Sequence, residues 1–498
     1  MKVLYYNWVD YLDDENRGGG VSQYLRNLMR EIDTQDEIKA TFLSSGISFD
    51  LINRKPRWER TRHGPQKDRA RRFEIVNSGV LAPGHLSFGN TAQVKHAPTL
   101  ACFFDFVDAT GPYDVIHFNN LEGLPAAAIE LKSRWPQMRV VLSLHNYYPF
   151  CSQVNLWHKE QQHCTDFDQG RKCIICLPST QKESSLKLAH ALAYRLKCSG
   201  IRPSSRTFKT LFLFAARVAR QTSKVVASVR SWRQRKADVT ARKSGPAKAP
   251  GAHFVIRRKT IVELLNRNCD RVLCVSESVR KLAEVHGLHS NLLLTQYIGT
   301  SVAEQFERNT SRPWLLHSDG TVSIGYLGYM RRDKGFFFLL SALEELPDDV
   351  AKRIRLVVAA KSAGADVMAR LAMLGDRLAE LKFYDGYANH NLAEILSHID
   401  LGVIPVLWND NLPQVAIEMH SHRIPLLTSD MGGARELSNC AEMVFKSGNV
   451  TSFHQRLDAV LSSDVNWPAY WESAKPPLSM KQHLNDLYVI YAEPVDQS

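Results

Sequence analysis

The sequence predicts an α/β protein of two doubly wound domains that face each other across a cleft. Short apolar runs rich in Val, Ile, Leu and Tyr alternate with segments of helical periodicity. Apolar runs of this kind are typical of parallel strands that are covered by helices on both faces. A stretch of weak periodicity rich in Gly, Ser, Asn and Pro, Gly299–Thr321, divides these runs into two groups. Ligands of such sheets bind at the carboxyl ends of the strands.

We expect strands in each half of the chain and helices between them. The strands of the first half are Val3–Asn7, Thr41–Ser44, Val115–Phe118, Val140–Leu144 and Arg271–Val275. Those of the second half are Val322–Leu327, Ile354–Ala359, Lys382–Tyr384, Leu401–Pro405, Pro425–Thr428 and Met443–Phe445. The clearest helix runs from Val21 to Ile32, where apolar residues recur at intervals of three and four.

The predicted domains follow from this pattern. Residues 1–300 form an N-terminal Rossmann-like domain that contains a basic helical insertion at 178–260. Residues 318–461 form a C-terminal Rossmann-like domain, and 462–498 form a helical tail expected to pack back on the N-terminal domain.

The composition is ordinary, but the charge is concentrated in one segment. The chain has 498 residues, of which 44% are hydrophobic and 23% charged, so a disordered or fibrous protein is excluded. Its net charge is +12, whereas Gln181–Thr260 alone holds 20 Lys and Arg against two acids, Glu183 and Asp238. The rest of the chain is therefore mildly acidic.

The basic segment is expected to form two cationic amphipathic helices within Ser184–Ala219, joined near Ser199–Ser205. Such helices lie on anionic membranes, which would suit an enzyme with a lipid-linked acceptor. A calmodulin target, a nucleic-acid site and a helical insertion with one solvated face have similar compositions. Membrane contact through 181–260 is the favoured interpretation, and nucleic acid is not the expected partner.

The chain is expected to be cytoplasmic, with peripheral attachment to the membrane. Its first residues are too few and too polar for a signal peptide, and no window approaches the ~18 apolar residues of a membrane span. Nine cysteines, five of them scattered, do not resemble a secreted disulfide framework.

Two loops have the composition of phosphate-binding loops. Arg17–Gly20 lies between the first strand and its helix, which is where backbone N–H groups approach anions. Its spacing fits neither a dinucleotide loop nor an ATP loop, and a turn with positive φ is the alternative. In the second domain the strand ends at Gly328, and the cations Arg331, Arg332 and Lys334 follow it. A solvated basic turn is the alternative there.

A carboxylate pair, Asp410 and Glu418, follows the strand that ends at Pro405. We expect Asn411 to cap a helix that carries Glu418, so that the amides of Asn411 and Leu412 face a diphosphate or a sugar. A surface helix with two ordinary acids would explain the cap but not the glycine turn at Met431–Glu436.

The order of these motifs resembles the retaining glycosyltransferases of family 4, within the glycosyl transferases group 1. The residues that carry the resemblance are Gly18–Gly20, His145–Pro149, Gly328–Gly335, the acid-x7-Glu motif and Ser429–Gly433. It covers 1–177 and 271–461 and implies the GT-B fold. It also implies a nucleotide-sugar donor, a glycan or lipid-linked acceptor, and transfer that needs no metal cofactor.

The resemblance also implies roles for single residues. Glu418 would bind the ribose hydroxyls of the donor, and Asp410 the hydroxyls of the donor sugar. Lys334 would neutralise the diphosphate, and the amides around Gly19 and Gly20 would contact it from the other side.

His145 lies where the family has a histidine beside the reacting centre, so His145 and Asp410 are the expected catalytic residues. A strand-end histidine bonded to backbone is the alternative for His145. The sequence departs from the family at Asp410, where Glu is usual, and at Tyr329, where Arg is usual. Arg331 or Arg332 could supply the missing charge.

Two other functions have similar sequence features. A nucleotide-sugar epimerase or phosphorylase on the same fold would share the carboxylates and the diphosphate site. A non-catalytic scaffold for membrane or nucleic acid would depend on the basic segment alone.

Four cysteines within 26 residues predict a structural zinc site. Cys151, Cys164, Cys173 and Cys176 include one C-x2-C pair, and His163 could replace one thiolate. The alternative is four small buried residues that shape a loop.

Overall fold

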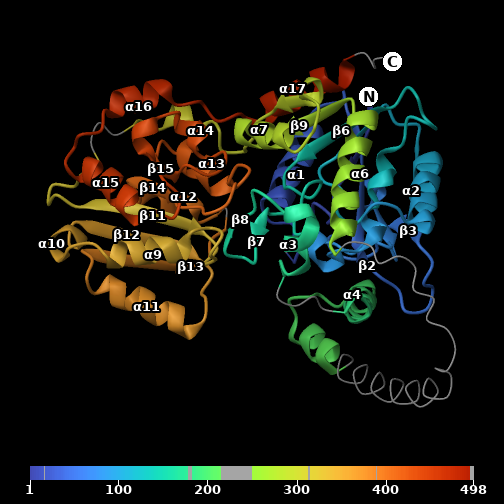
Figure 1. The fold of residues 1–498 in the computed structure, drawn as a ribbon, viewed down its shortest axis with the longest axis horizontal. Coiled ribbons are helices and arrows are strands. Elements are labelled where there is room, and N and C mark those ends of the chain that lie inside the picture. The colour runs from blue at the N-terminus through green and yellow to red at the C-terminus, as the bar shows by residue number, and fades with distance from the viewer. Residues whose placement is uncertain (16, 178–181, 215–249, 312–314, 389, 494–498) are drawn as a thin grey trace.

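Two sheets, one in each half of the chain, organise the structure (Figure 1). The computed structural model describes residues 1–15, 17–177, 182–214, 250–311, 315–388 and 390–493. Helices cover both faces of each sheet, as the apolar character of the strands predicts. The expected α/β architecture with two Rossmann-like domains is confirmed.

The N-terminal sheet has eight strands, in the order β10-β9-β6-β5-β1-β2-β4-β3. All neighbours are parallel except β3 and β4. Their bounds are β1 (Lys2–Tyr6), β2 (Lys39–Ser48), β3 (Arg57–Arg60), β4 (Arg72–Val76), β5 (Val115–Phe118), β6 (Arg139–Leu144), β9 (Arg271–Cys274) and β10 (Leu293–Thr295). The order reverses between β1 and β5, and ligands of doubly wound sheets bind at such a point.

The N-terminal helices follow the predicted alternation. They are α1 (Gly19–Ile32), α2 (Ala97–Thr110), α3 (Arg171–Ile174), α4 (Glu183–Cys198), α6 (Ala252–Asn268) and α7 (Glu277–Val285). A short antiparallel hairpin, β7 (Trp157–His158) and β8 (Gln162–His163), lies outside the main sheet. In Figure 1 this hairpin lies on the side of the domain that faces the C-terminal half.

The C-terminal sheet is fully parallel, in the order β13-β12-β11-β14-β15-β16. Its strands are β11 (Val322–Gly328), β12 (Ile354–Ala360), β13 (Glu380–Asp385), β14 (Leu401–Ile404), β15 (Leu426–Ser429) and β16 (Val444–Phe445). The helices are α8 (Gln305–Arg308), α9 (Phe336–Glu344), α10 (Asp348–Ala351), α11 (Ala365–Gly375), α12 (Leu392–Ser397), α13 (Gln414–Ser421), α14 (Arg435–Ser438), α15 (Val450–Leu461) and α16 (Trp467–Ser473).

The C-terminal segment divides between the two domains. Trp467 and Tyr470 of α16 are buried in the core of the C-terminal domain, so the predicted boundary at 461 is too early. The last helix, α17 (Met480–Ala492), packs on α1 of the N-terminal domain. There Tyr24 and His483 are joined by a hydrogen bond of 2.8 Å.

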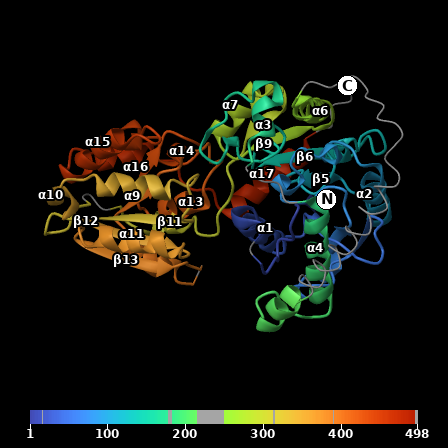
Figure 2. The same cartoon turned by 60° about the horizontal axis from the view of Figure 1, so that its bottom comes forward.

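The basic segment is largely helical where the structure describes it, and its last residues belong to α6. Helix α4 ends at Cys198, residues 206–214 form a second helical stretch, and 199–205 separate the two (Figure 2). Residues 178–181 and 215–249, which include the end of the predicted second helix, lie outside the described residues. The predicted limit at 260 is wrong, because α6 begins at Ala252 and buries Phe254 and Ile261 in the N-terminal domain.

Within the part of the chain that the structure describes, no helix combines the length and the apolar character that crossing a membrane requires.

Candidate functional site

The candidate site lies where loops of the two domains meet. Lys334 follows β11 and Asp410 follows β14, and these two strands are neighbours in the C-terminal sheet. In the N-terminal domain Gly19 and Gly20 follow β1, and His145 follows β6. The topology therefore places all five residues at the carboxyl ends of parallel strands.

Lys334 and Asp410 form an ion pair at the centre of this region. The Lys334 Nζ lies 2.5 Å from the Asp410 Oδ2, and the ammonium also lies 5.2 Å from the centroid of the Trp408 ring. Asp410 is only 7% exposed, so the pair is shielded from water on the carboxylate side. A buried carboxylate of this kind requires a cation, which a phosphate group could compete for.

Glycines hold the backbone of this pair in place. Gly335 has φ +75°, and a Cβ there would lie 1.7 Å from the Pro405 carbonyl oxygen. Gly432 has φ +77°, and its Cβ would lie 2.1 Å from the carbonyl oxygen of Asp410. The Gly433 N–H donates to the same oxygen at 3.0 Å. The glycine turn after β15 thus supports Asp410, and neither Gly335 nor Gly432 leaves room for a side chain.

The prediction that Asn411 caps α13 is wrong. The helix begins at Gln414 with Pro413 at its N-cap and without a side-chain cap. The Asn411 Nδ2 instead donates to the Leu144 carbonyl at 3.3 Å, and the Ser276 hydroxyl donates to the Asn411 carbonyl at 2.6 Å. Asn411 therefore joins the two domains directly. Pro413 directly precedes the helix in an extended conformation, where its missing N–H costs no helical hydrogen bond.

Glu418 is a buried carboxyl that lies on α13 and lacks a charged partner. It is 8% exposed, and its Oε2 has no hydrogen-bond partner within the described chain. Burial raises the pKa of Glu418 to about 7. Unpartnered buried carboxyl oxygens are costly, so this atom is suited to accept hydrogen bonds from a ligand.

The glycine loop of the N-terminal domain faces α13. Helix α1 begins at Gly19, which has φ +53° and open space around the position of a Cβ. A Cβ on Gly20 would lie 3.8 Å from the Cβ of Gln414, the first residue of α13. Gly19 and Gly20 thus lie opposite the helix that carries Glu418.

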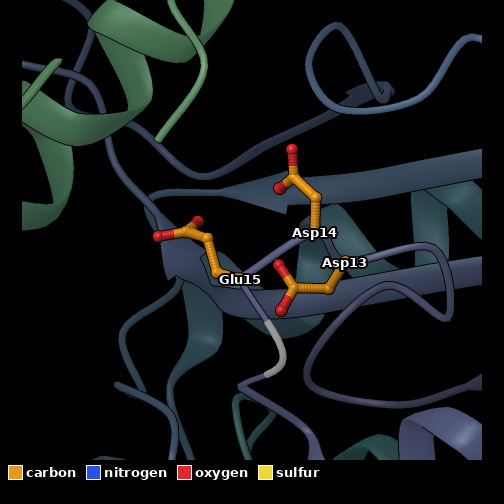
Figure 3. Close-up of side chains that lie close together, drawn as sticks. All are labelled: Asp13, Asp14 and Glu15. Atoms are coloured by element: carbon orange, nitrogen blue, oxygen red, sulfur yellow. The ribbon is translucent and has the colours of Figure 1, made fainter. Parts of the chain in front are cut away.

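An acidic cluster precedes this glycine loop (Figure 3). Asp13, Asp14 and Glu15 are, within the described ranges, the one group of three potential ligand residues whose ligand atoms lie within 4.8 Å of one another. Two of the three already have cations. Arg17 pairs with Asp13 at 2.5 Å, and the Lys197 Nζ of α4 lies 3.0 Å from Glu15. The cluster therefore anchors the loop and the basic segment.

His145 is neutral and has no backbone partner for its Nε2. Burial and the neighbouring His483 lower the pKa of His145 to about 3. Its Nε2 is buried and has no partner among the residues described. The ring lies beside Tyr24, with centroids 5.1 Å apart, and α17 supplies His483 behind it. The alternative of a hydrogen bond from this nitrogen to the backbone does not occur.

The two arginines of the phosphate loop differ. Arg331 pairs with Asp333 through two hydrogen bonds of 2.9 Å. Arg332 is exposed, and its side chain forms no hydrogen bond or ion pair with another described residue. Leu412, expected to offer its amide, is buried in the core that joins the domains. Arg332 is therefore the free cation beside Lys334.

Three contacts at the site were not predicted. The His163 Nε2 lies 3.2 Å from the Asn409 Nδ2. Tyr387 lies near Glu418, whose carboxylate contributes to raising the pKa of the Tyr387 phenol above its usual range, although burial is the larger cause. Glu436 accepts hydrogen bonds at 2.7–2.8 Å from backbone N–H groups at the start of α7. Only Glu436 has a sequence signal, since it ends the glycine turn that was singled out.

The four predicted zinc ligands, Cys151, Cys164, Cys173 and Cys176, lie away from this pair and line a single cavity against α6. All four are free thiols.

Comparison with known proteins agrees with this architecture. Residues 307–475 match the family model Glycosyl transferases group 1, and this range runs from α8 to just beyond α16. No curated protein is similar enough in sequence to count as a relative.

Solved structures show the same fold over the whole chain. HepE from Anabaena in complex with UDP is 13% identical with a TM-score of 0.54, and covers 98% of this chain and 100% of its own. Sucrose-phosphate synthase from Thermosynechococcus elongatus is 12% identical with a TM-score of 0.53, and covers 98% of each chain. A trehalose-6-phosphate structure from E. coli bound with UDP-2-fluoro glucose is 12% identical with a TM-score of 0.52, and covers 99% of this chain and 100% of its own. The predicted GT-B fold is confirmed.

Proposed function

We propose that the protein is a glycosyltransferase of family 4 that moves a sugar from a nucleotide-sugar donor to a glycan or lipid-linked acceptor, with retention of configuration. The observation that carries the proposal is the buried carboxyl of Glu418, whose Oε2 has no partner within the described chain and which lies on the helix that follows Asp410 of the Lys334–Asp410 pair and packs near Gly20. Structures of similar fold hold UDP or a UDP-sugar, so uridine diphosphate sugars are the first donors to test.

The donor would replace contacts that the protein now makes with itself. The ribose hydroxyls donate to Glu418, whose Oε2 is buried and otherwise lacks a partner within the described chain. Lys334 transfers its ammonium from Asp410 to the diphosphate, and Asp410 is then free to accept hydrogen bonds from the sugar. Arg332 and the amides of Gly19 and Gly20 complete the diphosphate site.

The chemistry follows from charge that develops as the sugar–phosphate bond breaks. Negative charge grows on the leaving diphosphate, and fixed cations and helix N-termini stabilise it there without a metal cofactor. The sugar becomes oxocarbenium-like in the transition state. His145, neutral because of burial, approaches that centre as a hydrogen-bonding group and not as a cation.

The acceptor and the location follow from the basic segment. The stretch 206–214 exposes Leu213 and Phe214, which are 56% and 66% exposed, next to Arg206 and Lys209. Apolar side chains beside cations are suited to an anionic membrane surface. We therefore propose peripheral attachment to the cytoplasmic membrane and a role in cell-surface polysaccharide or glycolipid synthesis.

The test measures donor consumption with and without acceptor. Purified protein is incubated with a panel of UDP-sugars and membrane lipid extract, and released UDP and labelled glycolipid are quantified. A transferase releases UDP and labels the acceptor together. Sugar conversion without any acceptor would identify an epimerase and would overturn the proposal.

A further inference from the structure

The loop after β6 grows into an excursion, residues 151–176, that brings four cysteines to one cavity. Cys151 begins the excursion, Cys164 follows β8, Cys173 lies in α3 and Cys176 comes just after it. All four line the cavity, which α6 closes on its other side. They therefore converge from separate local elements and not from a single turn.

The excursion has little regular structure of its own. Its strands are two residues long, its α-helix has four residues, and six non-glycine residues have positive φ, namely Val154, Leu156, Lys159, Glu160, Asp168 and Gln169. Left-handed conformations of this kind are unfavourable for residues other than glycine. Leu156 and Trp157 of the excursion join the core of the N-terminal domain, and a disulfide or a metal commonly holds loops that have little regular structure. No disulfide is present.

Contacts with α6 fix the outer wall of the cavity. The Arg258 Nε donates to the Phe150 carbonyl at 2.7 Å, and the guanidinium lies 3.7 Å from the centroid of the Phe167 ring. A Cβ on Gly170 would lie 2.3 Å from the Gly251 carbonyl oxygen, so the two segments are in close contact. The excursion is therefore attached to α6 at two points.

The charge around the cavity suits bound thiolates. Arg257, Arg258 and Lys172 line it together with the four cysteines, and no carboxylate belongs to that lining. A zinc ion with four thiolates carries a net charge of about −2, and neighbouring cations stabilise such a charge.

We infer that Cys151, Cys164, Cys173 and Cys176 bind one Zn²⁺ ion that holds the excursion together. Zinc is the metal that four thiolates in tetrahedral arrangement favour. Sulfur–zinc distances of about 2.3 Å place the sulfurs about 3.8 Å apart. No three of these thiols lie within 4.8 Å of one another in the described structure, so binding draws them inward.

The position of the site links it to the domain interface. The excursion carries the β7–β8 hairpin, and His163 at its end contacts Asn409, the neighbour of Asp410. An ion at the base of the hairpin therefore fixes a contact between the domains beside the proposed donor site.

The test measures metal content in the full-length protein. We expect about one zinc per chain after purification, and loss of that zinc in Cys164→Ser and Cys173→Ser. Cys440→Ser, outside the cluster, is the matched control and keeps the zinc. We also expect a chelator to lower the melting temperature of the wild type.

A second readout does not depend on how the variants fold. Cobalt exchanged into the wild type is expected to give the thiolate-to-metal charge-transfer absorption of a tetrahedral four-sulfur site. Zinc below about 0.2 equivalents, zinc retained in both cysteine variants, or these four thiols recovered as disulfides would each overturn the inference.

Discussion

The proposed donor region of the C-terminal domain and the excursion and basic segment of the N-terminal domain both follow the carboxyl ends of parallel strands, but in two different sheets and in different ways. The loops that follow β11, β14 and β15 are short, and glycines and backbone hydrogen bonds fix their conformation. After β6 the described residues 151–177 and 182–214 lie outside the main sheet, and side chains attach them to the rest of the domain.

The polar atoms of the two regions differ accordingly. In α4, Arg195 pairs with Asp50 at 2.6 Å, Lys197 pairs with Glu15 at 3.0 Å, and Tyr194 bonds to Glu59. In the donor region, Glu418 keeps a buried oxygen without a partner among the described residues. Satisfied polar groups indicate anchoring, whereas an unsatisfied buried group indicates a place for a ligand. This difference separates the donor site from the basic segment.

The largest effect should come from Lys334→Met. The change removes the cation that we assign to the diphosphate and leaves the Asp410 carboxylate without its partner. We expect kcat/KM to fall by about 10²–10³. Lys352→Met, an exposed lysine of the same domain, is the control and should change kcat/KM by less than about twofold. Equal activities of the two variants would contradict the role of Lys334.

The second effect concerns pH. Because burial raises the folded-state pKa of Glu418 to about 7, above its unfolded value, the free protein loses stability as pH rises from about 4.5 through 7. Glu418→Gln removes this loss, so its melting temperature should exceed that of the wild type by about 2–4 °C at pH 8.

Below pH 4.5 the two melting temperatures should converge, because the wild-type carboxyl is then neutral. The measurement is thermal unfolding across pH 4–8. A constant difference between the two proteins over that range would show that Glu418 does not titrate as a buried carboxyl.

The smallest effect tests the other region. Each of Arg206→Glu and Lys209→Glu should weaken binding to anionic vesicles at least about fivefold, since a basic residue near such a surface contributes about 1 kcal/mol and the introduced carboxylate is repelled. Cosedimentation with phosphatidylserine vesicles measures this. Lys352→Glu is the matched control, and equal binding of all three variants would remove the membrane role of 206–214.

The strands that can be predicted from the sequence are those whose residues are apolar and buried on both faces of the sheet. Val115–Phe118 was predicted with its observed bounds because both faces of that strand are buried. Strands β3 and β4 were missed because charged residues interrupt them. Arg72 begins β4 and is buried, and its guanidinium pairs with Asp10 at 2.9 Å. Because Arg72 is charged and its partner Asp10 is distant in the sequence, the sequence around β4 does not have the apolar pattern of a buried strand.

In the candidate site, too, contacts between residues that are distant in the sequence could not be predicted. The order of the motifs predicted that Lys334, Asp410 and Gly20 would lie at the carboxyl ends of strands, Gly20 in the first domain and the other two in the second, because strand topology decides that. The cap at Asn411 was wrong, because the Leu144 carbonyl from the other domain competes for that side chain. Contacts such as His163 with Asn409 depend on how the domains pack, which no local pattern contains.

Binding of nucleotides to the wild type and to Glu418→Gln tests the central claim most directly. Melting temperatures and calorimetric affinities are measured with UDP, UDP-sugars and other nucleotide sugars, with the exposed Glu394→Gln as control. At 100 times its Kd a ligand stabilises the folded state by about 2.7 kcal/mol. We predict that at least one nucleotide stabilises the wild type and Glu394→Gln, and that Glu418→Gln binds it about 10–100-fold more weakly. If no nucleotide raises the melting temperature, or if Glu418→Gln binds as tightly as the wild type, the donor site is not where we place it.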